Sequence, residues 1–451
     1  MSAPSRIFTT SATAGEFKRA MRHQLNQFSI DHKESVRLCT AAAKELQLTN
    51  YRQAQELLRD ALLSRPSCAL AFKLLGDMYR ALNDESSARA CQRNDLPESF
   101  FIRSAETASL SGAATVNRVP VYESQRCSAP MPSGVAEQLA FKATELKSDQ
   151  CFVDTVYDGL VWHDALNTLG MDKDKAVVSK HTVGCGALIE TIISQYQPRR
   201  LQGRAILLGA KGAHNFYHWT TDIIPRLTIL QAAGIELRST DTIIVSKANT
   251  SFAMQLLEAV GLQSDQIIET ETSTPYLQAD ELIVPYMQNK MGHTMGQWLP
   301  EQMKCLMGVG SIRSSDRKIF INRNPATAAG RTLSNSDAAE FFFKGQGFEV
   351  IYPETLNVQQ QAQLFASAGV VAGVHGAGLA NIVYCSAGTK IVEFYGAHIA
   401  PCYWLISALA GLQYFQHPCE LSEDTSVSRH AAGLQLDLDS VADLLQLIDQ
   451  N

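Results

Sequence analysis

The sequence predicts a small helical region followed by two α/β domains, each with a parallel sheet that helices cover on both faces. Three observations lead to this prediction. The chain has 451 residues, enough for two to four domains at roughly 100–200 residues each. Residues 31–94 carry apolar side chains at helical spacing and show no strand-like alternation. After about residue 201, short apolar strands alternate with amphipathic stretches, a pattern typical of doubly wound sheets.

Composition excludes several classes of function. The chain is 45% hydrophobic and 19% charged, and its net charge of −6 gives no general attraction to nucleic acid or to an anionic membrane. No apolar run reaches the ~18 residues that a membrane span needs. The ten cysteines are scattered, without a Cys-x-x-Cys pair. This usage predicts reduced thiols in a cytoplasmic protein and no structural zinc.

The predicted organisation begins with residues 1–30, which lack a continuous apolar signal segment and are expected to be a mobile lead-in. Residues 31–104 form the helical region. Residues 105–135, rich in Ser, Ala, Pro and Gly, are expected to be a linker or a meandering first strand. The first α/β domain then takes residues 136–310, and the second takes residues 311–451 and ends in a helix.

The helical region is expected to hold three or four antiparallel helices. Small side chains that let helices approach alternate with large ones that fill the space between them, at the spacing of a tetratricopeptide repeat. The pattern covers one and a half to two repeats, fewer than the roughly three that usually make a stable array. A helical bundle packed on the rest of the chain is the alternative interpretation. The residues at repeat spacing are Ala54, Leu58, Ala61, Pro66, Phe72, Leu75, Gly76, Tyr79 and Ala88.

A glycine turn is the sharpest signal in the second α/β domain. The sequence H-G-A-G-L at residues 375–379 directly follows an apolar strand and opens a helix. Glycines at such a turn let backbone N–H groups approach a phosphate, and the imidazole of His375 can donate to a phosphoryl oxygen. A purely structural turn is the alternative, since Gly-x-Gly alone is common.

Three charged side chains at strand ends extend this candidate phosphate site. Arg323 ends the first strand of the domain and Arg331 follows in the same loop, where two guanidinium groups would suit a diphosphate. Glu393 ends a later strand and could accept the two hydroxyls of a ribose. Solvated surface charge is the alternative for Arg331 and for Glu393.

The first α/β domain carries a dense segment over residues 212–227. If this segment is helical, His218 and Asp222 share a face at a spacing of four residues, which suits an oriented base. Pro225 favours the other possibility, in which both lie in a loop before the helix. Tyr217 and Trp219 could face a sugar ring, although aromatic residues are core residues by default.

The metal-binding pattern Asp-x-Asp occurs twice, at residues 172–174 and 437–439. One copy lies among lysines and the other lies beside the last helix, so we expect both to be accidental and no metal site to be present.

Taken together, these residues resemble the glycosyltransferases of family 61. Two motifs carry the resemblance in the correct order. The first is H-N-F-Y-H-W at residues 214–219 with Asp222 and P-R-L at 225–227, and the second runs from Glu354 through H-G-A-G-L to Glu393. The resemblance covers roughly residues 140–420, and Arg323 lies where the family has a strand ending in I-x-R.

The resemblance implies a GT-B architecture of two Rossmann-like domains and an inverting, metal-independent transfer. The donor would be a nucleotide sugar, best a UDP-sugar, with no further cofactor, and the acceptor would be a hydroxyl of a glycan or a protein. Either Asp222 or His218 would be the base. The implied donor-binding residues are Arg323, Arg331, His375, Gly376, Ala377, Gly378, Leu379, Asn381 and Glu393, and the implied cleft residues are His214, Asn215, Tyr217 and Trp219.

The resemblance and the absence of a signal segment together suggest a cytoplasmic bacterial enzyme that builds surface polysaccharide or modifies protein. The helical region could bind a protein partner, self-associate or present the acceptor. A different class of function is the alternative: a nucleotide-sugar-binding adaptor without catalysis, which acts through its helices.

Overall fold

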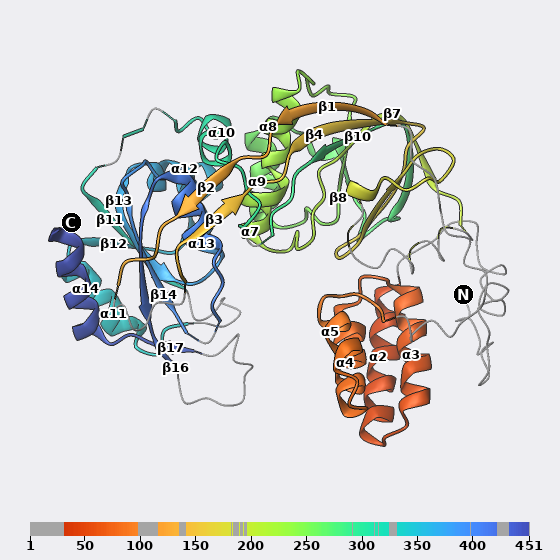
Figure 1. Ribbon diagram of the computed structural model, residues 1–451, viewed down its shortest axis with the longest axis horizontal. Coiled ribbons are helices and arrows are strands. Elements are labelled where there is room, and N and C mark those ends of the chain that lie inside the picture. Colours follow the sequence, from red (N-terminus) through yellow and green to blue (C-terminus); the bar gives the residue numbers. More distant parts are fainter. Residues whose placement is uncertain are drawn as a thin grey trace.

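A computed structural model describes the chain in two large parts, a helical region and a pair of β-sheets with their helices (Figure 1). The described residues are 31–97, 116–134, 141–181, 183, 189, 193, 196–290, 292–310, 312–313, 315–323, 332–396, 398–421 and 433–450. The predicted lead-in of residues 1–30 and the candidate phosphate ligand Arg331 therefore lie outside the described residues.

The described residues 31–97 form four helices, where three or four were expected: α2 (His32–Gln47), α3 (Tyr51–Ser64), α4 (Ala69–Ala81) and α5 (Glu85–Gln92). Asp31 and Asp84 cap α2 and α5, because their side chains accept hydrogen bonds from the backbone N–H groups of Glu34 and Ser87. At Gly76, α4 and α5 are in contact, and an added Cβ would lie 3.5 Å from that of Cys91, an ordinary van der Waals distance. The tetratricopeptide identity of these helices stays a prediction.

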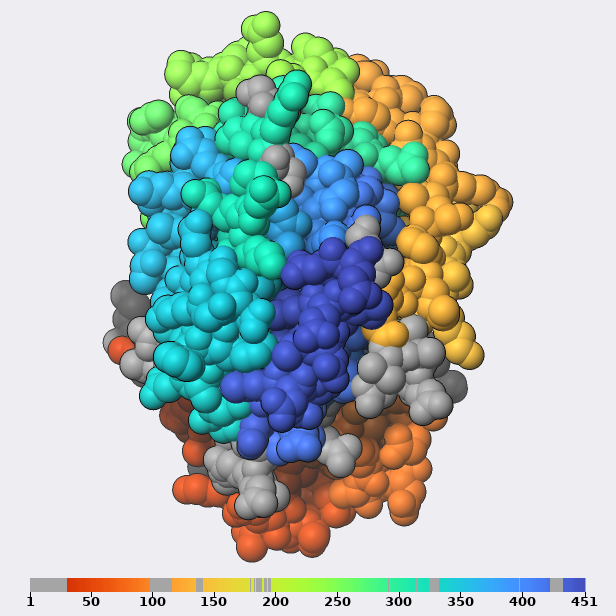
Figure 2. Space-filling view, turned by 90° about the vertical axis from the view of Figure 1, so that its left-hand side faces the viewer, coloured from red at the N-terminus to blue at the C-terminus, as the bar shows by residue number. Residues whose placement is uncertain are grey.

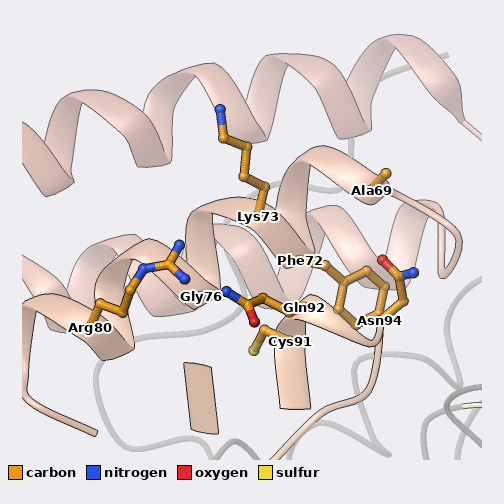
Figure 3. Close-up of a pocket in the computed structure, with 8 residues that line it drawn as sticks. All are labelled: Ala69, Phe72, Lys73, Gly76, Arg80, Cys91, Gln92 and Asn94. Atoms are coloured by element: carbon orange, nitrogen blue, oxygen red, sulfur yellow. The ribbon is translucent and has the colours of Figure 1, made fainter. Parts of the chain in front are cut away.

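A pocket of about 170 Å³ opens between α4 and α5 (Figure 3). Phe72 lines its apolar part, and Lys73 and Arg80 bring positive charge to it. The other lining residues are Ala69, Gly76, Cys91, Gln92 and Asn94.

The helical region packs on the first sheet and is not a free module. Its buried side chains share one apolar cluster with Trp162 and Tyr276, two of the largest fully buried side chains of the chain. His32 Nε2 also lies 2.9 Å from the carbonyl oxygen of Glu271. Because this contact buries an apolar face of the helices, the short helical array does not have to be stable alone.

The first sheet has eight strands and is mixed, which corrects the prediction of a purely parallel sheet. Its path is β1-β4-β10-β7-β8-β9, with β5 and β6 attached beside β10. The segments after residue 201 do pair in parallel, β10 with β7, β7 with β8 and β8 with β9. The antiparallel strands come earlier in the chain. The strands are β1 (Asn117–Tyr122), β4 (Cys151–Tyr157), β5 (Leu160–His163), β6 (Thr168–Met171), β7 (Arg199–Leu207), β8 (Thr242–Val245), β9 (Ile267–Glu269) and β10 (Tyr276–Tyr286).

The second sheet is parallel throughout, with the order β12-β11-β13-β14-β15. β11, the first strand of this sheet in sequence, lies in the interior of the sheet. The chain continues from β11 to β12 on one side and from β13 to β14 on the other, so the two connections diverge. The carboxyl ends of these two strands therefore form the place where ligands bind in open parallel sheets. The strands are β11 (Arg317–Ile321), β12 (Phe348–Ile351), β13 (Ala368–Val374), β14 (Lys390–Tyr395) and β15 (Gln413–Pro418).

Helices cover both faces of the second sheet, in agreement with the sequence pattern. On the outer face, α11 (Ser336–Gly345) and α14 (Leu438–Gln450) bury Phe343 and Leu445 against Phe320 and Phe394 of the strands. On the face toward the first sheet lie α12 (Val358–Ala366), α13 (Cys402–Ala410) and the 3₁₀-helical segment η7 (Ala377–Tyr384). Their apolar side chains join a cluster that extends into the first sheet and its helices α9 (Ser251–Ala259) and α10 (Leu299–Leu306).

The segment that was expected to be a linker connects the two sheets by specific bonds. Beyond β1, it contributes β2 (Arg126–Ala129), which pairs with the later strand β3 (Thr144–Lys147), and the pair lies along the second sheet (Figures 1 and 2). Trp404 Nε1 of α13 donates to the carbonyl oxygen of Pro130 at 2.8 Å. Ser133 bridges to Phe415 at the edge strand β15. These bonds hold the two sheets in their relative position.

Candidate active site

The first motif forms one helix with a widened turn. It consists of α7 (Phe216–His218), a π-helical turn (Trp219–Ile223) and α8 (Pro225–Ala232). In the wide turn, the N–H of Ile224 bonds to the carbonyl oxygen of Trp219, five residues earlier, at 3.0 Å. Pro225 then starts α8, a position that requires no backbone N–H. The segment is therefore helical despite its proline, and π-helical turns of this kind are frequent at functional sites.

This helix pairs His218 with Asp222. The Nδ1 atom of His218 lies 2.6 Å from Oδ2 of Asp222, a distance typical of a charge-assisted hydrogen bond. The two side chains are 30% and 12% exposed, so the imidazole is the more accessible member of the dyad. Gly212 packs against the ring with a φ of +86°, and a Cβ there would lie 2.4 Å from His218 Cδ2. The imidazole is thus held on both sides.

Three other residues of the first motif support the helix. Asn215 caps it by accepting a hydrogen bond from the N–H of Tyr217 at 2.9 Å. Trp219 is fully buried and donates to the carbonyl oxygen of Ala213 at 2.7 Å. Half-buried Arg226 donates to backbone carbonyl groups, including that of Pro285 at the end of β10 at 2.9 Å. Of the predicted cleft residues, Asn215 and Trp219 therefore have structural partners, whereas His214 is exposed.

The second motif brings Arg323 to the glycine turn. Arg323 follows β11 and His375 follows β13, so both stand at the carboxyl ends that diverge. The guanidinium Nη2 of Arg323 donates to the carbonyl oxygen of His375 at 3.4 Å, and Gly376 lies directly beneath it. The hydroxyl of Tyr403 donates to the carbonyl oxygen of Gly376 at 2.7 Å. The turn is therefore fixed from two directions.

The remaining residues of the second motif are of two kinds, partly accessible and fully buried. Ala377 and Gly378 are half-buried at the start of η7. Leu379 and Asn381 are fully buried. The Asn381 amide donates to Gln361 of α12 at 2.8 Å and to the carbonyl oxygen of Gly378 at 3.1 Å. Asn381 therefore fastens η7 to the helix beside it and does not present its amide to a ligand.

Glu393 has a different environment from the one that the resemblance implies. One carboxylate oxygen is bonded to Nδ1 of His375 and the other accepts a hydrogen bond from the hydroxyl of Tyr414. The residue is 2% exposed. A carboxylate that is buried with both oxygens engaged does not offer a free acceptor to the hydroxyls of a ribose. The geometry instead connects Glu393 to His375.

The two motifs meet where the sheets join. The ring of Tyr217, next to His218, packs edge-on against that of Tyr403 with centroids 6.0 Å apart, and Tyr403 lies 5.2 Å from the ring of His375. Burial raises the pKa of the Tyr217 phenol. The chain thus brings its His-Asp dyad and its Arg-His turn to the same junction, although they are about 100–160 residues apart in sequence.

Sequence reasoning missed three polar residues of this region: Asn289, Tyr403 and Tyr414. The Asn289 amide donates to the hydroxyl of Tyr217 at 3.2 Å and to that of Thr221 at 3.1 Å. Tyr403 and Tyr414 lie within apolar segments that read as ordinary core. No local pattern distinguishes them, because their partners come from strands and turns that only the sheet order brings near.

Gly376 gives a direct test of the turn. A Cβ at this position would lie 1.6 Å from Nη2 of Arg323, so Gly376→Ala should displace the guanidinium while the extended backbone, at a φ of 172°, accepts alanine. We expect affinity for a bound diphosphate to fall about tenfold, as for the loss of one hydrogen bond to a charged group. Titration calorimetry measures the loss. Gly345→Ala, where an added Cβ meets nothing within 4 Å, is the control and should bind normally.

The comparisons agree with the motif analysis. The family model Glycosyltransferase 61 matches residues 216–392, a stretch that includes His218, Asp222, Arg323 and His375. No match was found among curated proteins. Within the described ranges, no helix is both long and apolar enough to cross a membrane. In the same part of the chain, no three His, Cys, Asp or Glu side chains are grouped to hold a metal ion.

Proposed function

Because residues 216–392 match the model of glycosyltransferase family 61, we propose that the chain transfers a sugar from a nucleotide sugar to an acceptor hydroxyl. The acceptor is a glycan or a protein. The observation that supports this proposal most is the meeting of the His218–Asp222 dyad with the Arg323–His375 turn at one junction. The dyad can accept a proton, and the turn can bind a departing phosphate.

In the proposal, the two sheets with their helices are the two halves of a GT-B enzyme. The second sheet holds the donor, because its divergent carboxyl ends lie at β11 and β13. Arg323 and His375 follow these two strands, and the turn adds backbone N–H groups at the start of η7. A diphosphate between these groups would meet positive charge and N–H donors. We take the donor to be a UDP-sugar.

The reaction then needs no cation in this proposal. The acceptor hydroxyl loses its proton to Nε2 of His218 while its oxygen attacks the anomeric carbon. The bond from that carbon to the phosphate oxygen breaks, and its electron pair leaves with the nucleoside diphosphate. Asp222 holds the ring through Nδ1 and stabilises the imidazolium that forms. Arg323, His375 and the backbone N–H groups stabilise the leaving diphosphate. Attack from the opposite side inverts the anomeric configuration.

The cysteines support a reducing compartment and therefore a cytoplasmic protein in this proposal. The nine described cysteines are free thiols, even though Cys39 and Cys68 have their sulfur atoms 3.7 Å apart.

Turnover in the absence of metal tests the proposal. The purified protein is incubated with a panel of UDP-sugars and with candidate glycan and peptide acceptors, with and without EDTA. We expect UDP release from one donor at the same rate in both conditions, and a product whose anomeric configuration by NMR is opposite to that of the donor. Complete loss of turnover in EDTA, restored by a divalent cation, would contradict the metal-independent mechanism.

A further inference from the structure

The strongest polar cluster of the second sheet is a buried chain of three side chains, Tyr414–Glu393–His375. They come from neighbouring strands: Tyr414 lies on β15, Glu393 on β14, and His375 directly after β13. The three residues are 6%, 2% and 5% exposed. Each bond between them is present, from the phenol to one carboxylate oxygen and from the other oxygen to Nδ1 of the imidazole.

This chain restricts the chemistry of His375. A carboxylate accepts hydrogen bonds and donates none, so it fixes one proton of the imidazole at Nδ1 and leaves Nε2 as the atom that can face a ligand. Nε2 donates to a phosphoryl oxygen when it carries the second proton of the imidazolium. The backbone N–H of His375 donates to the carbonyl oxygen of Phe394 at 2.8 Å, which holds the residue to β14 as well. Burial and the charge of Glu393 raise the pKa of the Tyr414 phenol, so it stays a donor to the carboxylate.

We propose that Glu393 and Tyr414 are positioning residues, which orient the imidazole of His375 toward the diphosphate and make no contact with the ribose. This inference rests on the proposed donor site. It assigns Glu393 a role that differs from the one implied by the motif, and it adds Tyr414, which no motif contains. The physical argument is the same as for a metal-bound or catalytic histidine, whose second nitrogen is held by a carboxylate that sets both the tautomer and the ring angle.

The tautomer of His375 tests the geometry without any ligand. In protein labelled with ¹⁵N-histidine, long-range ¹H–¹⁵N NMR spectra distinguish a proton on Nδ1 from one on Nε2, and His375→Ala identifies the signal. We expect the Nδ1–H form in the unmodified protein and a substantial Nε2–H population in Glu393→Gln. An unmodified protein whose His375 carries a proton on Nε2 and none on Nδ1 would overturn the inference.

Binding experiments separate positioning from ribose contact. The probes are UDP and 2′,3′-dideoxyuridine diphosphate, which lacks both ribose hydroxyls. We expect Glu393→Gln to weaken both ligands by the same factor, about tenfold. In a His375→Ala background, the same substitution should cause no further loss, because Glu393 acts through the missing ring. A loss for UDP that disappears with the dideoxy ligand, or that persists without His375, would show that Glu393 contacts the ribose.

Tyr414→Phe should give a smaller loss of the same kind, about two- to fivefold for both ligands, since it removes one donor to Glu393. Tyr384→Phe is its matched control: Tyr384 is also buried in this half of the molecule, and its hydroxyl has no hydrogen-bond partner among the described residues. Glu349→Gln, on the half-exposed edge of the sheet, is the control for the carboxylate. Equal losses in Tyr414→Phe and Tyr384→Phe would overturn the role of Tyr414.

Failure of this inference is distinguishable from failure of the proposed function. If the unmodified protein binds neither UDP nor the dideoxy ligand, the donor site is wrong, and the NMR experiment still reports on the arrangement of His375 and Glu393. If UDP binds and the Glu393 loss depends on the ribose hydroxyls, the donor site stands and the positioning role is wrong.

Discussion

Arg323→Ala should weaken UDP binding by roughly 10- to 100-fold, the largest loss that we expect from any single substitution at the donor site. The guanidinium is the charged group that lies across the glycine turn, at the carboxyl ends of the two divergent strands. Its removal leaves the diphosphate with the imidazole and the backbone N–H groups alone. The effect on turnover should appear in kcat as well as in KM, because the charge on the diphosphate grows as it leaves.

Arg313→Ala is the matched control for this substitution. Arg313 is an exposed arginine a few residues before β11. Its substitution by alanine therefore removes the same charge at a distance from the turn. Calorimetric titration with UDP measures both variants. Equal affinities for Arg323→Ala, Arg313→Ala and the unmodified protein would show that Arg323 does not bind the donor.

Asp222→Asn should lower kcat by about 10²- to 10⁴-fold, the range typical of general acid–base catalysis, and leave the Kd for UDP unchanged. The carboxylate holds His218 through Nδ1 at 2.6 Å, and asparagine cannot stabilise an imidazolium in the same way. Donor affinity should persist because the dyad belongs to the other half of the molecule. The measurement combines steady-state kinetics with a UDP titration of the same sample.

The dyad also predicts how substitutions of His218 and Asp222 combine in a double variant. If Asp222 acts through His218, then His218→Gln and the double variant should lose about as much kcat as Asp222→Asn alone, because the residues work as one unit. Asp265→Asn, an exposed aspartate beside the first sheet, is the control. Full turnover in His218→Gln together with a large loss in Asp222→Asn would make Asp222 itself the base.

Local patterns in the sequence predicted the parts of the fold that depend on local interactions. Helical periodicity predicted three or four helices before Asn94, where the structure has four, and continuous apolar runs indicated strands of the second sheet. The spacing of His218 and Asp222 predicted their contact only for a helical segment, one of the two alternatives that Pro225 left open. The π-helical turn that accommodates this proline could not be foreseen. A proline gives a strong local signal, but whether the chain breaks or widens its helix there depends on what packs around it.

Features that depend on sheet order were outside the reach of the sequence. The antiparallel strands of the first sheet arise from pairings such as β4 with β10, between residues that are more than 100 positions apart. Glu393 illustrates the same limit within the site. Its place near a strand end suggested an exposed ligand, yet the register of β13, β14 and β15 puts His375 and Tyr414 on either side of it. Such neighbours follow from tertiary structure and not from spacing.

The central claim is that the carboxyl edge of the second sheet binds a nucleoside diphosphate without a metal ion. Calorimetric titration of the unmodified protein with UDP in EDTA tests it most directly, with His375→Ala measured in parallel. We predict micromolar binding that is the same with and without EDTA and at least tenfold weaker in His375→Ala. Absence of binding to UDP and to the other nucleoside diphosphates would contradict the claim and favour an adaptor that acts through its helical region.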